Sequence, residues 1–262
     1  MQNLYNALFT TKYDKLIFRV KNYFYFGAKP KFLNPLFYMR IINEKNSQKK
    51  FEKIDNGVLN NEIKNLLAKS DSTGCEYSDY VTLWNNLNQI KPKYILELGS
   101  GITSVIIAYY IKTRCVGEKI KFISMEENEY YYDNINSIFP NYLKQYVSFC
   151  LSERVEQNYD GFSGCHYKDI PNYNYDFIFI DGPVDRRKFN NKNYPKTFNS
   201  DFLNYILKSK NTVNAILDQR ILTLMTLKKL LPRADIKYYP SKKITIFKNV
   251  NHNHIKRKII IN

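Results

Sequence analysis

The pattern of apolar and polar residues along this chain changes near residue 91 and becomes regular after it. Beyond it, short apolar runs are separated by segments with helical spacing, which predicts strands that alternate with helices. Such alternation is typical of a parallel sheet with right-handed crossover connections. The predicted strands are residues 93–98, 121–125, 146–151, 176–180, 212–217, 235–239 and 243–247. The predicted helices between them are residues 102–112, 128–138, 201–208 and 220–231.

The last two predicted strands are joined only by Pro240, Ser241 and Lys242. So short a connection cannot form a crossover, and these strands must therefore pair antiparallel. The sequence predicts an α/β fold: a Rossmann-like, mostly parallel seven-stranded sheet with an antiparallel C-terminal hairpin, plus a mainly helical N-terminal extension. Residues 152–173 and 182–199 are expected to be long loops.

The first third of the chain lacks sharp periodicity and is expected to form a helical cap or extension. Residues 13–26 and 30–42 mix aromatic residues with Lys and Arg, and two interpretations stay open for them. These segments either pack as a cap against the main domain, or lie at an interface with a membrane or a lipid-linked substrate. Residues 43–53 are polar and predict a linker, whereas residues 78–90 predict a helix before the first strand.

The chain therefore divides into three parts. Residues 1–90 are the N-terminal extension, residues 91–250 the Rossmann-like domain, and residues 251–262 a basic tail. The formal net charge is +16, but the basic excess is spread along the chain, and its abundance of Lys, Asn, Ile and Tyr is what an AT-rich genome produces regardless of function. Nucleic acid is therefore disfavoured as a partner, while attraction to anionic substrates or membrane surfaces stays open.

The four cysteines, Cys75, Cys115, Cys150 and Cys165, lie far apart without a C-x-x-C pair. Their spacing indicates neither a zinc site nor a disulfide framework, so reduced thiols and a cytoplasmic location are expected. No apolar run approaches the ~20 residues that a membrane span needs. Peripheral membrane contact remains an alternative, and the sequence does not determine the oligomeric state.

Three motifs stand at the ends of predicted strands. The first is Glu-Leu-Gly-Ser-Gly over residues 97–101, where Gly99 and Gly101 lack the Cβ atoms that would keep a ligand from the turn. The second is the pair Glu126 and Glu127, which begins 25 residues after Gly101. An acidic residue at this place in a Rossmann-like site accepts hydrogen bonds from ribose hydroxyls.

We favour Glu126 for this contact because it directly follows the apolar run, and expect Glu127 in the first turn of a helix. The alternative is that both carboxylates only begin the helix. The third motif is Asp181-Gly182-Pro183, directly after the fourth predicted strand.

Together the motifs resemble class I S-adenosylmethionine-dependent methyltransferases, whose motif I reads E/D-x-G-x-G. The similarity is greatest to a bacterial subgroup with L-E-L-G-S-G and a later V-D-G-P, often followed by an arginine, and covers residues 93–248. It implies S-adenosylmethionine as the cofactor and a sugar, glycan or small-metabolite hydroxyl as the acceptor. The cofactor-binding residues that the resemblance implies are Glu97, Gly99, Ser100, Gly101, Thr103, Glu126 and Asp181.

Methyl transfer requires alignment of the acceptor and removal of its proton. Asp181 is placed to do either, and Asp218 ends the next predicted strand. Catechol-type methyltransferases hold a divalent metal at these two places, so a Mg²⁺ site of Asp181 and Asp218 is one alternative. Gln219 stands where those enzymes have asparagine. Without a metal, Asp181, Asp185 or His166 would serve as the base, with His166 in a loop overhanging the site.

Asp185, Arg186 and Arg187 follow the third motif and are candidates for substrate binding. The two arginines would suit an anionic acceptor such as a phosphate or a sugar acid. The alternative is that they belong to a solvated basic run in a chain that is basic throughout.

Three rival functions remain. The first is an NAD-dependent enzyme, because residues 99–104 fall one residue short of G-x-G-x-x-G/A. The second is a nucleic-acid methyltransferase, for which base methylation predicts (N/D/S)-P-P-(Y/F/W), whereas the chain has Asp-Gly-Pro-Val from Asp181. The third is a scaffold that keeps the fold without turnover.

Overall fold

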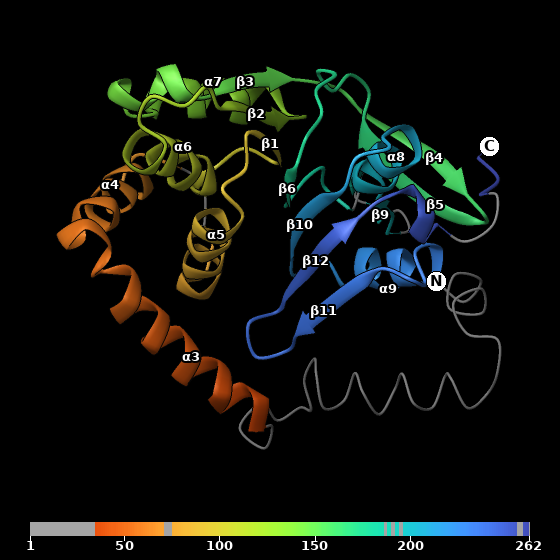
Figure 1. Ribbon diagram of the computed structural model, residues 1–262, viewed down its shortest axis with the longest axis horizontal. Helices are drawn as coiled ribbons and strands as arrows, with labels where there is room; N and C mark the ends of the chain where they lie inside the picture. Colours follow the sequence, from red (N-terminus) through yellow and green to blue (C-terminus); the bar gives the residue numbers. More distant parts are fainter. Residues whose placement is uncertain are drawn as a thin grey trace.

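The computed structural model describes residues 35–70, 75–185, 188–189, 192–193, 196–255 and 259–261. At its centre is a seven-stranded sheet with the order β11-β12-β10-β6-β1-β2-β3 (Figure 1). Its strands are β1 (Tyr94–Leu98), β2 (Lys121–Glu126), β3 (Ser148–Leu151), β6 (Phe177–Ile180), β10 (Val213–Asp218), β11 (Asp235–Tyr239) and β12 (Ile244–Val250).

All pairs in this sheet are parallel except those of β12, which runs antiparallel to both β10 and β11. The predicted Rossmann-like fold with its C-terminal hairpin is therefore confirmed. From β1 the chain first builds outward to β2 and β3, and then returns to add β6 on the other side. This reversal is a topological switch point, and open α/β sheets bind their ligands at the carboxyl ends of the strands beside such a point.

Helices cover both faces of the sheet, which explains why the central strand β6 is apolar throughout rather than alternating (Figure 1). All four residues of β6 are buried. Ile95 and Phe179 pack on the face of α5 (Tyr77–Ile90) and α6 (Ile102–Arg114). Leu96 and Ile178 pack on the face of α8 (Asp201–Lys208) and α9 (Ile221–Leu230).

In the N-terminal extension, the elements before α5 pack on the same side of the sheet as α5 and α6. They are α3 (Pro35–Phe51), the 3₁₀ turn η3 (Ile54–Gly57) and α4 (Val58–Leu67). The linker expected at residues 43–53 is wrong, because α3 continues through it and buries Phe51 against the ring of Tyr80, with 5.3 Å between ring centroids. The aromatic segment expected at residues 13–26 lies outside the described residues.

The long loop expected at residues 152–173 is also wrong over much of its length. It contains a hairpin of β4 (Arg154–Tyr159) and β5 (Phe162–Tyr167), and β9 (Phe198–Asn199) pairs with β5. The turn is Asp160-Gly161, both with positive φ (54° and 84°), and this dipeptide is a strong hairpin signal that the sequence analysis overlooked.

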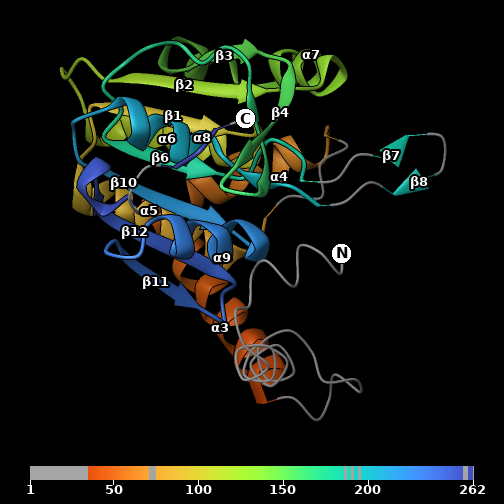
Figure 2. The ribbon, with the colours of Figure 1, turned by 90° about the vertical axis from the view of Figure 1, so that its right-hand side faces the viewer.

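The second expected loop, residues 182–199, includes the short pair β7 (Lys188–Phe189) and β8 (Lys192–Asn193), which extends away from the body in Figure 2. The remaining elements are α7 (Glu129–Ile138) and the 3₁₀ turns η4 (Asn141–Tyr146) and η5 (His252–His254). Among the helices of the described ranges, none combines the length and the hydrophobicity needed to span a bilayer.

Candidate functional site

Glu97 lies at the end of β1 and is fully buried. Its carboxylate accepts three hydrogen bonds, from Thr103 Oγ1 (2.6 Å), Ser104 Oγ (2.5 Å) and Ser124 Oγ (2.6 Å). Burial raises the pKa of Glu97 to about 7, although the three hydroxyl donors oppose the shift. Through these hydrogen bonds Glu97 connects β1 to the first turn of α6 and to β2. It thereby helps to hold the glycine turn between β1 and α6 in place.

Gly99 and Gly182 bring two loops at the switch point into backbone contact. Gly99 has a φ of +97°, and a Cβ there would lie 2.8 Å from Gly182 N. A Cβ on Gly182 would lie 2.7 Å from Gly99 N and 2.5 Å from Tyr167 Oη. Neither position accepts a larger residue without displacing backbone, so both glycines are required by packing.

Gly101 has different surroundings. Its φ of 169° is extended backbone that any residue adopts, and a Cβ there would meet no atom of the described residues within 4 Å. The space in front of the turn is therefore open at Gly101. Of the two glycines of the motif, this is the one whose missing side chain leaves room for a ligand.

Glu126 lies at the end of β2 and faces the same turn. It is 7% exposed and accepts hydrogen bonds from Ser100 Oγ (3.0 Å), Glu127 N (3.1 Å) and Asn128 N (3.0 Å). Burial and the neighbouring Glu127 raise the pKa of Glu126. The structure thus brings together Ser100 and Glu126, two residues that the sequence assigned to cofactor binding.

Glu127 is not in the first turn of a helix, and that expectation is wrong. The helix α7 begins at Glu129, and its N-cap is Asn128, whose Oδ1 accepts from Tyr130 N at 2.9 Å. Glu127 instead accepts hydrogen bonds from Tyr167 Oη (3.0 Å) and Val184 N (2.8 Å). It therefore joins the end of β2 to the hairpin and to the loop after β6.

Asp181 directly follows β6 and is paired with Arg220, a residue that the sequence analysis did not single out. Arg220 Nη2 lies 3.3 Å from Asp181 Oδ1, and Arg220 Nη1 donates to Pro183 O at 3.1 Å. Burial raises the pKa of Asp181, and the guanidinium opposes this shift. The only sequence signal for Arg220 was its position two residues after Asp218.

Asp218 ends β10 and lies close to two residues from the N-terminal extension. Ligand atoms of Cys75, Asp79 and Asp218 all lie within 4.8 Å of one another. Burial, followed by the charge of Asp218, raises the pKa of Asp79 to about 9. Burial, followed by the charge of Asp181, raises the pKa of Asp218 to about 7. Sequence analysis missed Asp79, whose visible role is in the capping box of α5 with Glu76.

The remaining predicted site residues are scattered. His166 is in β5 rather than in an overhanging loop, and it lines a cavity of about 1080 Å³ together with Asp201 and Lys208. Burial and the charge of Lys208 lower the pKa of His166. Asp185 is half-buried and forms an ion pair with Lys196 at 3.0 Å. The expected substrate ligands Arg186 and Arg187 lie outside the described residues.

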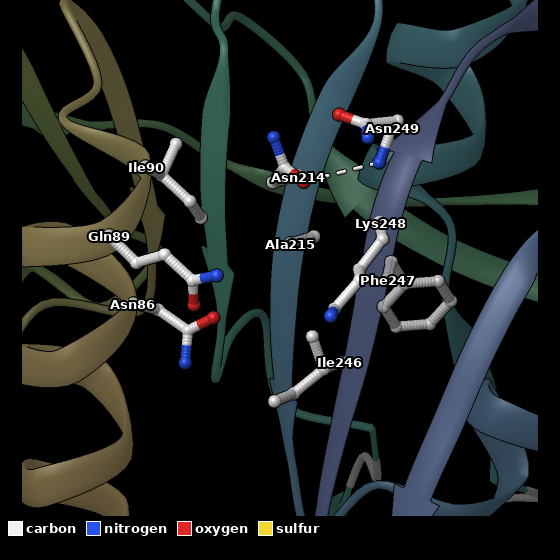
Figure 3. A pocket seen from close by; sticks show the side chains of 9 residues that line it. All are labelled: Asn86, Gln89, Ile90, Asn214, Ala215, Ile246, Phe247, Lys248 and Asn249. Atoms are coloured by element: carbon white, nitrogen blue, oxygen red, sulfur yellow. Dashed lines mark hydrogen bonds between the residues drawn. The ribbon is translucent and has the colours of Figure 1, made fainter.

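A smaller cavity, of about 360 Å³, lies at the opposite edge of the sheet (Figure 3). It is bordered by Gln89 and Ile90 at the end of α5, and by Asn214 at the start of β10. Asn214 Oδ1 accepts a hydrogen bond from Asn249 N at 3.1 Å. None of the strand-end motifs lies here, so the carboxyl edge remains the candidate site.

Comparisons with known proteins assign no family to this chain. No family model and no curated protein matches it. Among solved structures, it is similar to a putative O-methyltransferase from Klebsiella pneumoniae, with a TM-score of 0.44 and 13% identity over 74% of this chain and 90% of that one. An O-methyltransferase from Bacillus cereus in complex with SAH gives a TM-score of 0.44 and 15% identity, over 72% and 90%.

A methyltransferase from Geobacter sulfurreducens gives a TM-score of 0.46 and 12% identity, over 77% of this chain and 97% of that one. Similarities at this level assign neither a family nor a function. Any function therefore has to be argued from the site itself.

Proposed function

We propose that this chain is an S-adenosylmethionine-dependent methyltransferase that acts on a hydroxyl of a sugar, glycan or small metabolite. The observation that carries the proposal is the free space beside Gly101. The hydrogen-bonded pair of Ser100 and Glu126 lies next to this turn, at the switch point of the sheet. Ligands of Rossmann-like folds bind at this point. The strand order with its antiparallel C-terminal hairpin supports the same proposal, because it is the methyltransferase variation on the Rossmann plan that the motifs resemble.

Cofactor binding would use the polar atoms around this turn. The carboxylate of Glu126 already accepts a hydroxyl hydrogen bond from Ser100, and a ribose hydroxyl offers the same donor. Thr103 and Glu97 hold the first turn of α6 in place through their 2.6 Å hydrogen bond. Glu97 thus acts on the cofactor through the loop that it positions.

When bound, S-adenosylmethionine supplies a methyl group that is already activated. Transfer to the acceptor hydroxyl would also require a protein group that takes up the hydroxyl proton. We propose that Asp181 accepts this proton. Asp181 is half-buried directly after β6, and Arg220 stabilises its carboxylate form. Asp218, one strand further along the same edge, would orient the acceptor.

The residues present do not fit the expected Mg²⁺ site of Asp181 and Asp218. Arg220 places a guanidinium 3.3 Å from Asp181 Oδ1, which supplies positive charge where the ion would be held. Gln219 has a positive φ of 42°, and its side-chain oxygen faces Lys243 Nζ at 3.5 Å. We therefore assign no step to Mg²⁺ at this pair.

The test is calorimetric titration of the purified chain with S-adenosylhomocysteine, with NAD⁺ as the parallel ligand. We expect S-adenosylhomocysteine alone to bind. Glu126→Ala should weaken its binding by roughly 10- to 100-fold, because a hydrogen bond to a charged group contributes about 1.5–3 kcal/mol. The matched control is Glu129→Ala, which removes an exposed carboxylate from the first turn of α7.

Binding of NAD⁺ alone would instead support the dehydrogenase hypothesis. A folded protein that binds neither ligand would favour a scaffold without turnover. Equal affinity of the Glu126→Ala and Glu129→Ala variants would remove Glu126 from the site.

A further inference from the structure

We propose that Cys75, Asp79 and Asp218 form a binding site for one divalent transition-metal ion of the Zn²⁺ class, with one coordination position left open beside Asp181. Metal binding at this site is argued from the positions of the three side chains alone. The role of the metal, which is to hold the acceptor oxygen during transfer, rests on the function proposed above.

The three side chains converge from two parts of the chain. Cys75 lies two residues before the start of α5, Asp79 is in the first turn of α5, and Asp218 is the last residue of β10. Their ligand atoms lie within 4.8 Å of one another. Two ligands bound to Zn²⁺ at 2.0–2.3 Å with tetrahedral angles are roughly 3.5 Å apart. Small side-chain rotations would close this difference.

Two buried carboxylate oxygens in this cluster have no hydrogen-bond partner within the part of the chain that the structure describes. They are Asp79 Oδ1 and Asp218 Oδ1, in residues that are only 2% and 6% exposed. A buried polar atom without a partner is costly, and buried charges are normally paired or coordinate a metal. The other oxygen of Asp79 accepts a hydrogen bond from Glu76 N at 2.9 Å, which orients the carboxylate. Such support is typical of metal ligands.

The nearby arginines already have other partners. Arg40 is ion-paired with Glu76, and Arg220 with Asp181. Asp79 and Asp218 also lie near cationic groups, because the charge of Arg40 lowers the pKa of Asp79 and the charges of Arg220 and Lys243 lower the pKa of Asp218. Burial outweighs these charges and raises both pKa values, so a bound cation would add the compensation that these side chains do not supply.

The chemistry of the donors selects the kind of ion. A thiolate with two carboxylates favours Zn²⁺, Fe²⁺ or Co²⁺ over Mg²⁺, which prefers oxygen ligands only. Three protein ligands and one open position are the arrangement of catalytic rather than structural zinc sites. Asp218 follows Leu217, which pairs in register with Ile180, the residue before Asp181. The open position would therefore lie at the same sheet edge as the proposed proton acceptor.

The experiment is a Co²⁺ titration of the full-length chain after treatment with a chelator. We expect one equivalent to bind, with a thiolate-to-Co²⁺ charge-transfer band in the near ultraviolet. Cys75→Ser should remove this band, and Asp218→Asn should weaken Co²⁺ binding at least tenfold. The matched control is Cys150→Ser, a half-buried thiol on β3 that should leave the spectrum unchanged. Circular dichroism verifies that each variant is folded.

The absence of a charge-transfer band in the folded wild-type protein at saturating Co²⁺ would overturn the proposal. A band that survives Cys75→Ser would also overturn it. Azide, used as a small anionic probe, should shift the visible Co²⁺ bands if one position is open, and an unchanged spectrum would contradict that part. Because the readout needs no cofactor, a metal band without binding of S-adenosylhomocysteine would reject the proposed function and keep the metal site.

Discussion

The two glycines after β1 show how one motif combines two physical requirements. Gly99 is needed because its φ is positive and because the backbone of Asp181 and Gly182 fills the space of a side chain. Gly101 meets neither restriction, since its backbone is extended and its surroundings are empty. Packing therefore requires the first glycine, whereas the second leaves open the space in front of the turn.

This difference predicts opposite results for two matched substitutions. Gly99→Ala should reduce the free energy of unfolding by roughly 1–3 kcal/mol, because a strained backbone and a steric conflict are imposed together. Gly101→Ala should leave the stability nearly unchanged and weaken binding of S-adenosylhomocysteine. Urea unfolding and calorimetry of both variants provide the check. A Gly101→Ala variant with wild-type affinity would show that no ligand approaches this turn.

Glu97 predicts a pH dependence of stability. Its pKa in the folded state is raised to about 7, so the folded protein binds this proton more tightly than the unfolded chain does. The contribution of Glu97 to stability is therefore greatest below its unfolded pKa of about 4.3, and is lost as the pH rises through the folded value.

Glu97→Gln should remove this dependence, because an amide occupies the same space without titrating. Relative to wild type, the variant should gain stability between about pH 5 and about pH 8, by an amount on the order of 3 kcal/mol at most. Urea unfolding at both pH values measures the difference. If the difference in unfolding free energy between wild type and Glu97→Gln does not change with pH, Glu97 has its ordinary pKa in the folded protein.

At the scale of elements, the hairpin β4–β5 forms part of the chain segment that connects β3 to β6. Its Tyr167 reaches the end of β2 through Glu127, and its Gly164 lies against Tyr159 and Ser200. A Cβ on Gly164 would come within 2.8 Å of the Tyr159 ring and 2.9 Å of Ser200 Cβ. The hairpin is thus packed against both the switch-point loops and the start of α8.

Gly164→Ala should therefore destabilise the protein by roughly 1–3 kcal/mol through overpacking. The control is Ser163→Ala, since Ser163 is the neighbouring residue of β5 and is exposed. Thermal unfolding of the two variants compares them directly. Equal melting temperatures would mean that the hairpin does not pack tightly on α8.

At the scale of the whole molecule, the N-terminal extension and the sheet share one hydrophobic core. Phe51 and Leu59 of the extension belong to the same buried cluster as Ile95 and Phe179 of the sheet. The extension also holds the start of α5, because Glu44 accepts hydrogen bonds from Tyr77 N (2.5 Å) and Ser78 N (3.1 Å). It therefore helps to place Cys75 and Asp79 beside the sheet.

Glu44→Ala should lower the free energy of unfolding by roughly 1–3 kcal/mol, since it leaves two amide groups of α5 without their charged acceptor. Lys45→Ala is the matched control, because Lys45 is exposed on the same helix. Urea unfolding of the full-length variants tests the expectation. If both variants unfold at the same denaturant concentration, α3 does not stabilise the start of α5.

Local patterns of the sequence were sufficient for the sheet and for the turn that ends β1. Apolar runs between helical segments specify buried parallel strands, and a three-residue connection after Tyr239 excludes a crossover. The Ser100–Glu126 contact follows from the same logic, because adjacent parallel strands place their carboxyl ends at one edge. These features depend on neighbours in sequence or on adjacent strands.

Only the tertiary structure decided which acidic groups meet. The sequence predicted that Asp181 and Asp218 share one metal site. In the structure Asp181 forms an ion pair with Arg220, and Asp218 clusters with Cys75 and Asp79. The spacing of the cysteines had indicated no metal site, because ligands from separate elements leave no local pattern. The physical reason is that the packing of α5 on the sheet, rather than any spacing along the chain, sets the distances among these side chains.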